Sequence, residues 1–369
     1  MTKSATKEGT MRYEQRFAGR AADGHFRETQ RMELSSLGIG TYLGQPDEKT
    51  DAAYTAAIVA AVENGINVID SAINYRFQRS ERSIGAALQQ LAAKGFSREE
   101  IVLCTKGGYL TPDGAMPADP NEYFFREYIQ QGVFSAKDLA AGSHCMTRKF
   151  LKDQLGRSLK NLGVECVDVY YLHNPETQLA EIPKPEFLQR VRAAFEFLES
   201  AVEAGEIRYY GMATWTGFRQ EPRARDAMQL VEITQIAQEI AGGIHHFRFV
   251  QLPFNLGMPE ALTVGNQMFR ERARTLAEAA TDLDITVIAS ASLLQGQVAR
   301  NLPGFVAEAF GLENDAERAL QFARSAPGIT TALVGMSRVE HAKANARLVS
   351  VAPATVDDFS KLFSRGEGA

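Results

Sequence analysis

The chain has 369 residues, of which 45% are hydrophobic and 23% are charged, and its formal net charge is -5. This composition is typical of a soluble globular protein. The slight excess of acidic residues gives no electrostatic reason to expect nucleic acid or an anionic membrane as a partner. Residues 1–17 lack the apolar core of a secretory signal, and no stretch approaches the roughly 20 apolar residues that span a bilayer. We therefore predict a cytoplasmic protein.

Along the chain, a polar leader (1–33) is followed by short apolar runs that alternate with longer, Ala-rich stretches of helical periodicity. The eight predicted strands are 36–40, 66–70, 101–106, 166–172, 207–213, 247–252, 285–290 and 331–335. The eight predicted helices lie near 50–64, 80–93, 149–161, 186–204, 224–240, 267–282, 312–326 and 338–348. Such alternation is typical of βα units on a parallel sheet. We predict an α/β fold in which residues 1–369 form a single (β/α)8 TIM barrel.

An open doubly wound sheet would show the same alternation of strands and helices. Its usual Gly-rich dinucleotide fingerprint is absent here, because GIGTYLGQ after the first predicted strand leads to no GxGxxG. Gly65, Gly163 and Gly205 each follow a predicted helix and precede a strand, where a left-handed cap is expected. The repeated helix, glycine and strand pattern favours the barrel.

Two long connections interrupt this pattern, and both leave the carboxyl end of a predicted strand. Residues 107–147 follow the third strand and contain too many aromatic side chains for a flexible linker, so we predict a folded, lid-like insertion. Residues 174–185 follow the fourth strand and are rich in proline. Both loops are expected to border the active site of a barrel.

Four chemically useful residues stand at or just beyond predicted strand ends: Asp70, Tyr75, Lys106 and His173. Carboxyl ends of parallel barrel strands open on one face, so the four side chains are expected to share a pocket. A lysine held by a carboxylate would lower the pKa of a nearby tyrosine, and a histidine could orient the same substrate oxygen. Each residue alone also fits a structural role, such as capping a turn or covering the core. Together, they favour carbonyl–alcohol interconversion.

A metal-dependent barrel hydrolase is the alternative enzyme class, and it would require clustered histidine and carboxylate ligands at strand ends. His245 and His246 are instead adjacent and precede a strand. Cys104, Cys145 and Cys166 are odd in number and have no CxxC spacing. We predict no metal site and no disulfide.

The sequence resembles the aldo-keto reductase superfamily. The matching motifs are DSAINY (70–75), SERSIGAAL (80–88), TKGG (105–108), YYLHNP (170–175), VQLPFN (250–255) and LVGMSRVEHAKANARL (333–348). This resemblance implies a nicotinamide-dependent oxidoreductase in which Tyr75 is the general acid or base. Lys106 would be the partner that lowers its pKa, Asp70 the ion-pair partner of the lysine, and His173 the residue that orients the carbonyl. It also implies that the cofactor lies extended across the strand ends without a Rossmann unit.

The resemblance further assigns the cofactor contacts. The implied residues are Gly40, Thr41, Asp70, Thr214, Gln251, Ser290, Leu293, Gln295, Gly296, Ser337, Arg338, His341 and Asn345. A guanidinium at Arg338, at the start of a helix, suits the extra phosphate of NADP(H), although NAD(H) remains an alternative. Tyr109 and Trp215 are the candidate substrate contacts. Phe124, Phe125 and Tyr128 could line the same wall or pack within the insertion.

The chain departs from the family pattern at three positions, where Ala213, Ser290 and Ala344 replace the usual serine, tyrosine and glutamate of the cofactor site. These departures keep a second function open, because the superfamily includes the β subunits of voltage-gated potassium channels. In that alternative the chain is a cofactor-sensing binding protein with little turnover. The partner expected of the enzyme is a small carbonyl or alcohol substrate, and the sequence leaves its identity, the reaction direction and the oligomeric state open.

Overall fold

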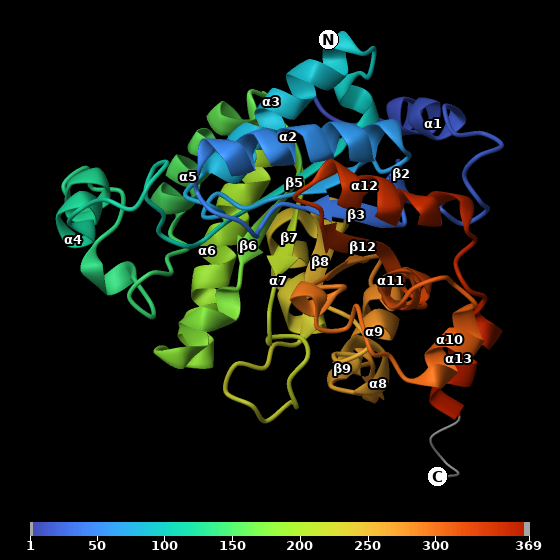
Figure 1. Cartoon of the computed structure of the whole chain (residues 1–369). Helices are drawn as coiled ribbons and strands as arrows, with labels where there is room; N and C mark the ends of the chain where they lie inside the picture. The colour runs from blue at the N-terminus through green and yellow to red at the C-terminus, as the bar shows by residue number, and fades with distance from the viewer. Residues whose placement is uncertain (1–2, 365–369) are drawn as a thin grey trace.

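The computed structural model describes residues 3–364, and eight parallel strands form a closed barrel at its centre (Figure 1). Around the barrel the strands follow the order β11-β12-β3-β4-β5-β6-β7-β8. Their bounds are β3 (Leu37–Gly40), β4 (Val68–Asp70), β5 (Val102–Gly107), β6 (Val167–His173), β7 (Ile207–Ala213), β8 (Phe247–Pro253), β11 (Thr286–Ser290) and β12 (Ile329–Gly335). Each predicted strand lies within two residues of an observed one at both ends. The predicted TIM barrel is confirmed.

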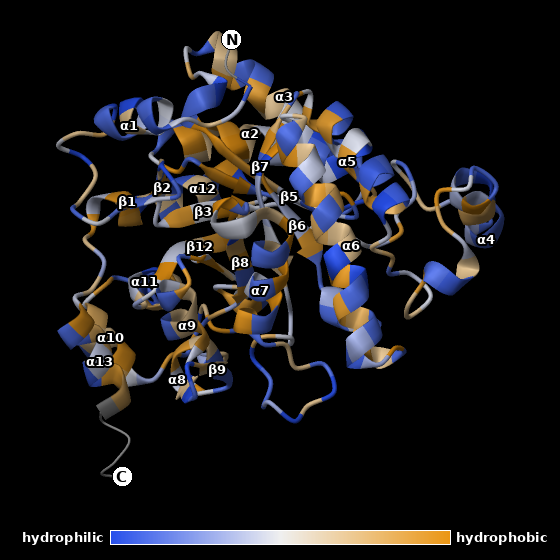
Figure 2. Ribbon diagram, turned by 180° about the vertical axis from the view of Figure 1, so that it is seen from behind, coloured by the Kyte–Doolittle hydropathy of each residue, from blue (hydrophilic) through white to orange (hydrophobic). Residues whose placement is uncertain are grey.

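Helices surround the barrel, and their apolar sides face the strands (Figure 2). The principal helices are α2 (Glu48–Glu63), α3 (Arg79–Ala93), α5 (Arg148–Leu162), α6 (Lys184–Glu203), α7 (Leu230–Ala241), α9 (Leu276–Asp282), α11 (Asp315–Ser325) and α12 (Val339–Ala346). The shorter helices α8 (Glu260–Thr263) and α10 (Gly304–Phe310) precede α9 and α11, and α13 (Val356–Ser364) follows α12. Gly65, Gly163 and Gly205 have φ values of 96°, 66° and 73°. The predicted left-handed caps are therefore present.

Two helices begin later than the sequence predicts. The predicted helix near 224–240 begins at Leu230. The predicted helix near 267–282 begins at Leu276, because its first part is the hairpin of β9 (Gln267–Phe269) and β10 (Arg272–Arg274). The two residues between these strands, Arg270 and Glu271, have φ values of 48° and 64°. Such a two-residue turn with both φ values positive reverses an antiparallel pair.

The segment 3–35, which begins with the described part of the polar leader, closes the amino-terminal end of the barrel. It contains α1 (Lys7–Gln15) and a hairpin of β1 (Phe26–Thr29) and β2 (Met32–Ser35). Met32 and Leu34 of β2 are buried in one cluster with barrel side chains such as Val102 and Val169. Asp168 Oδ1 accepts a hydrogen bond of 2.7 Å from the backbone N–H of Ala5. With this end covered, the barrel is left to open at the carboxyl ends of its strands.

The insertion 107–147 is folded, and it contains α4 (Pro120–Phe124). In both views α4 projects sideways, away from the barrel (Figures 1 and 2). Its aromatic residues form a core of their own with α5, in which Tyr128, Phe134 and Phe150 are buried and Phe124 packs against them. Phe125 is exposed. The predicted lid function of this segment stays a prediction. None of the described helices is long and apolar enough to cross a membrane.

Candidate active site

The four candidate catalytic residues lie together at the carboxyl ends of neighbouring strands. Asp70 ends β4, Lys106 is near the end of β5, and His173 ends β6. The parallel pairs β4–β5 and β5–β6 place these strand ends side by side. Tyr75 lies in the loop after β4, and its ring centre is 5.8 Å from that of His173. Segments far apart in the sequence are thus brought to one face, as predicted.

Lys106 and Asp70 form a buried ion pair at the base of this group. The distance from Lys106 Nζ to Asp70 Oδ2 is 2.6 Å, and the two residues are 1% and 4% exposed. Lys106 Nζ also donates to the carbonyl oxygen of Ser71 (2.7 Å), and Gln251 Nε2 donates to Asp70 Oδ1 (2.8 Å). Burial alone would lower the pKa of Lys106, but the negative charges of Asp70 and of an ionised Tyr75 outweigh it and raise this pKa. The ammonium is therefore held in its charged form.

Tyr75 lies directly above this ammonium, with Lys106 Nζ 5.0 Å from the centre of the phenol ring. The sequence predicted that Lys106 would lower the Tyr75 pKa. In the structure, burial of the phenol is the larger effect and raises the Tyr75 pKa above 10, and the lysine offsets only part of that rise. The phenol of the protein without cofactor is therefore protonated at neutral pH, as a proton donor must be.

His173 is neutral in this environment. Burial lowers its pKa well below 6.5, and the charge of Lys106 lowers it further. Its Nδ1 atom is buried and makes no hydrogen bond with the residues that the structure describes. His144 Nε2 lies 2.8 Å from the backbone oxygen of His173 and supports the strand end from behind. A neutral imidazole beside the Tyr75 ring can donate a hydrogen bond to a substrate oxygen without competing for its proton.

The backbone after Tyr75 is strained. Arg76, Phe77 and Gln78 are consecutive non-glycine residues with φ values of 47°, 56° and 70°. Left-handed backbone costs roughly 1–2 kcal/mol for each such residue. A turn of this kind persists only when its surroundings hold it.

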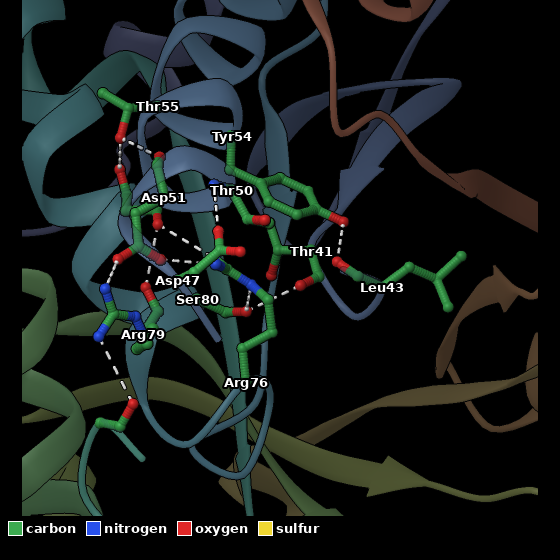
Figure 3. Close-up of polar contacts among 12 residues, drawn as sticks. Thr41, Leu43, Asp47, Thr50, Asp51, Tyr54, Thr55, Arg76, Arg79 and Ser80 are labelled. Atoms are coloured by element: carbon green, nitrogen blue, oxygen red, sulfur yellow. Dashed lines mark hydrogen bonds and ion pairs between the residues drawn. The ribbon is translucent and has the colours of Figure 1, made fainter. Parts of the chain in front are cut away.

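Hydrogen bonds of the Arg76 guanidinium stabilise this strained turn (Figure 3). The guanidinium is buried and donates from Nη1 to Asp51 on α2 (2.6 Å), from Nε to Ser80 Oγ (3.1 Å) and from Nη2 to Ser83 Oγ (3.0 Å). Ser80 Oγ in turn donates to the backbone oxygen of Thr41 after β3, over 2.8 Å. One side chain therefore fixes the loop of the candidate proton donor to α2, α3 and the end of β3.

Replacement of Arg76 by glycine is expected to lower kcat about 10- to 100-fold, because glycine keeps the positive φ but releases the loop, and misplacement by about 1 Å can cost that much. Phe77→Gly is the matched control, since it relieves the same backbone strain and leaves the guanidinium contacts in place. Steady-state kinetics and urea unfolding of both variants provide the measurement. Equal kcat values for the two variants would show that Arg76 does not position the tyrosine.

A cavity of about 560 Å³ opens above the four residues and extends across the ends of β3, β4, β6, β7, β8, β11 and β12. Most of the predicted site residues line it. They are Gly40, Thr41, Asp70, Tyr75, His173, Thr214, Trp215, Gln251, Ser290, Leu293, Gln295, Gly296, Ser337, His341 and Asn345. The residues of the insertion do not contribute to this lining.

Three predicted residues stand outside the cavity wall. Lys106 is buried beneath Tyr75. Arg338 is exposed, and its Nη2 atom donates to His341 Nε2 over 2.7 Å. Tyr109 lies behind His173, with ring centres 5.2 Å apart, and its hydroxyl bonds Thr177 Oγ1 over 2.9 Å. Tyr109 is therefore placed to support His173 rather than to contact the cavity.

The cavity also contains polar groups that fit a bound nucleotide. The hydroxyl oxygens of Thr214 and Ser292 are buried and have no hydrogen-bond partner among the described residues. Both residues line the cavity. A buried polar atom without a partner is costly unless a ligand or water satisfies it. The donor at Thr214 was predicted, whereas Ser292 was not.

Sequence reasoning missed several other lining residues. Tyr42 and Leu43 are 57% and 43% exposed and lie at the rim, where the Tyr42 ring centre is 5.0 Å from that of Tyr75. The signal that could have found them is a pair of large apolar residues two and three positions after the glycine that ends β3. Asn174 also lines the cavity, in left-handed backbone with φ 46°.

Comparison with known proteins shows which sequences and structures this chain resembles. The model of the Aldo/keto reductase family matches residues 36–364. A putative voltage-gated potassium channel subunit beta of Schizosaccharomyces pombe is 26% identical over 209 residues, which are 56% of this chain and 50% of the relative. An NADP(+)-designated aldo-keto reductase of the same yeast is 30% identical over 178 residues, 48% of this chain and 40% of the relative. The chain thus spans about half the length of the curated relatives it matches.

Solved structures show the same fold over nearly the whole chain. An aldo/keto reductase from Klebsiella pneumoniae in complex with NADP and acetate has a TM-score of 0.62 and 18% identity, over 93% of this chain and 95% of that one. A glycerol dehydrogenase from Gluconobacter oxydans has a TM-score of 0.63 and 16% identity with the same coverage of both chains. With the family model matched from the first barrel strand to the last helix, this chain belongs to the aldo/keto reductase family.

Proposed function

We propose that this protein is an NADP(H)-dependent oxidoreductase that interconverts an aldehyde or ketone and an alcohol. The observation that carries the proposal is the buried Lys106–Asp70 pair directly beneath Tyr75, with neutral His173 beside it, on the floor of a large cavity. The bound nicotinamide supplies or accepts the hydride. In reduction, Tyr75 donates the proton to the substrate oxygen, Lys106 stabilises the resulting phenolate, and His173 orients the oxygen.

The proposed cofactor contacts follow the cavity wall. Gln251 and Thr214 would hold the carboxamide of the nicotinamide, and the loop 291–296 would approach the pyrophosphate. Ser337 and Asn345 line the far end of the cavity. Ser337 lies two residues before the start of α12, and Asn345 lies within this helix. Arg338 stands at the N-cap of this helix, where backbone N–H groups and the helix dipole favour a phosphate.

The proposal is tested by incubating the purified protein with NADPH and a panel of aldehydes and ketones. Carbonyl-dependent oxidation of NADPH, with the alcohol as product, is the expected result. Tight NADPH binding with no turnover across the panel would instead favour the cofactor-sensing alternative, to which the potassium channel relative and the departures at Ala213, Ser290 and Ala344 point.

Replacement of Arg338 by alanine is expected to raise the KM for NADPH and leave that for NADH nearly unchanged. A hydrogen bond to a charged group is worth roughly 1.5–3 kcal/mol, which corresponds to about a 10- to 100-fold loss of preference for NADPH. The measurement is the ratio of kcat/KM for the two cofactors. Lys343→Ala removes another exposed charge of α12 and is the control. An unchanged ratio in Arg338→Ala would show that Arg338 does not recognise the additional phosphate of NADPH.

The pH dependence of the two reaction directions should differ. Reduction uses the protonated phenol, whose pKa is raised above 10, and the pKa of His173 is lowered below 6.5. The kcat/KM for reduction should therefore be level through the neutral range, above the lowered pKa of His173 and below the raised pKa of Tyr75. Oxidation uses the phenolate and should rise across the same range. A reduction profile that titrates within this range would contradict the assignment of protonation states.

A further inference from the structure

A second cavity of about 380 Å³ adjoins the first on its β6–β7 side, and nothing in the proposed chemistry uses it. Asn174 and Trp215 line both cavities and form the boundary between them. The remaining wall includes Glu176 in η4 (Pro175–Ala180), directly after β6, and Arg225 in the long connection after β7. This second cavity, here called the side chamber, adjoins the main cavity at these two shared residues.

Glu176 is the unusual residue of the side chamber. It is only 5% exposed, and its Oε1 atom accepts hydrogen bonds from three successive backbone N–H groups, those of Trp215 (2.6 Å), Thr216 (3.0 Å) and Gly217 (3.4 Å). Its Oε2 atom is buried and has no partner among the described residues. One oxygen therefore holds the tryptophan loop in place, while the other is a buried acceptor that no described protein group satisfies.

The other polar groups of the side chamber include both hydrogen-bond donors and hydrogen-bond acceptors. Arg225 donates from Nε to the backbone oxygen of Leu179 (2.7 Å), and its two Nη groups have no protein partner that the structure records. Asp226 and Thr177 add a carboxylate and a hydroxyl to the wall. Trp215, the only tryptophan of the chain, is 44% exposed and offers an aromatic face at the boundary. Acceptors, donors and one flat apolar surface thus surround a single space.

We infer that the side chamber binds the hydroxyl-bearing part of a polyhydroxylated substrate whose carbonyl lies at Tyr75. This inference rests on the proposed function. Two carboxyl groups beside one guanidinium give an anionic substrate no net attraction. A plain alkyl chain would leave Glu176 Oε2 buried without a partner, at a cost of roughly 1–3 kcal/mol. Hydroxyl groups both donate and accept, so they satisfy the carboxylates and the guanidinium together, while the C–H side of the substrate packs on Trp215.

The first test measures binding without turnover, since the fluorescence of the single tryptophan reports on the boundary of the side chamber. Erythritol and butanol, which have the same number of carbon atoms, are titrated into the protein without cofactor. Saturable quenching by erythritol is expected, and Glu176→Gln should weaken it about tenfold, because the amide keeps the loop contact and loses the second acceptor oxygen. Glu221→Gln removes an exposed carboxylate from the same loop and should change nothing. Equal affinity for butanol, or no effect of Glu176→Gln, would overturn the inference.

The second test measures specificity with NADPH and the paired aldehydes erythrose and butanal. The ratio of their kcat/KM values should favour erythrose and fall about tenfold or more in Glu176→Gln and Trp215→Ala, with Trp215→Phe recovering most of the loss. Reduction of both aldehydes, with a ratio of kcat/KM values that neither variant alters, would overturn the assignment of the side chamber and leave the proposed function standing. If no carbonyl were reduced while erythritol still bound, the proposed function would fail, and with it the assignment of the ligand as substrate.

Discussion

Replacement of Tyr75 by phenylalanine is expected to lower kcat for carbonyl reduction about 10²- to 10⁴-fold, the range that one positioned proton donor contributes. Phenylalanine keeps the ring that packs between Tyr42 and His173 and removes only the hydroxyl. The affinity for NADPH should therefore change little, which separates a lost proton donor from a misfolded site. Steady-state kinetics and nucleotide titration on the same preparation give the comparison.

The matched control for this variant is Tyr42→Phe. Tyr42 also lines the cavity, and its ring contacts that of Tyr75, but it lies far less buried and has no lysine beneath it. Its loss of a hydroxyl should cost less than tenfold in kcat. A Tyr42→Phe variant as inactive as Tyr75→Phe would indicate that the Tyr42 hydroxyl at the rim of the cavity takes part in the proton transfer, and would contradict the assignment of Tyr75 as the sole donor.

Replacement of Lys106 by methionine is expected to damage both activity and stability. The change leaves the Asp70 carboxylate buried without its ion-pair partner, and breaking a buried pair in this way typically costs about 3–5 kcal/mol of unfolding free energy. It also removes the charge that stabilises the Tyr75 phenolate, so kcat should fall at least as far as in Tyr75→Phe. Urea unfolding and kinetics measure the two effects separately.

The double variant Lys106→Met with Asp70→Asn separates these roles. Without the buried carboxylate, the stability should return to within about 1–2 kcal/mol of the unmodified protein, because asparagine can still accept the hydrogen bond from Gln251. Activity should not return, because the cation is still missing. Recovery of activity in the double variant would mean that Lys106 serves the fold and not the reaction.

The barrel could be predicted from the sequence because its strands are short apolar runs, most of which end in glycine or a polar residue. Burial of these strands on both faces makes that pattern strong. The β9–β10 hairpin was not readable, since Gln267–Arg274 carries no strong alternation and its turn uses Arg270 and Glu271 instead of the glycine or asparagine that marks such turns. The strained turn at Arg76 could not be predicted either, because its three residues with positive φ are neither glycine nor asparagine.

The parts of the site that follow from strand ends could be predicted from the sequence. The parts that depend on how deeply a side chain is buried could not. Asp70, Lys106 and His173 are fixed by strand register, so their meeting follows from the barrel alone. The direction of the Tyr75 pKa depends on how far burial outweighs one ammonium, which no sequence pattern states. The role of Glu176 likewise depends on the fold of the loop that it holds.

The central claim is that Tyr75 exchanges a proton with a substrate oxygen while the nicotinamide exchanges hydride with the adjacent carbon. Single-turnover reduction of an aldehyde with NADPH deuterated at the transferable position tests it most directly. The account predicts one deuterium on the carbinol carbon of the product with the unmodified protein, and a transfer rate lower by about two orders of magnitude or more in Tyr75→Phe. Unlabelled product, or label transferred at an equal rate by Tyr75→Phe, would contradict it.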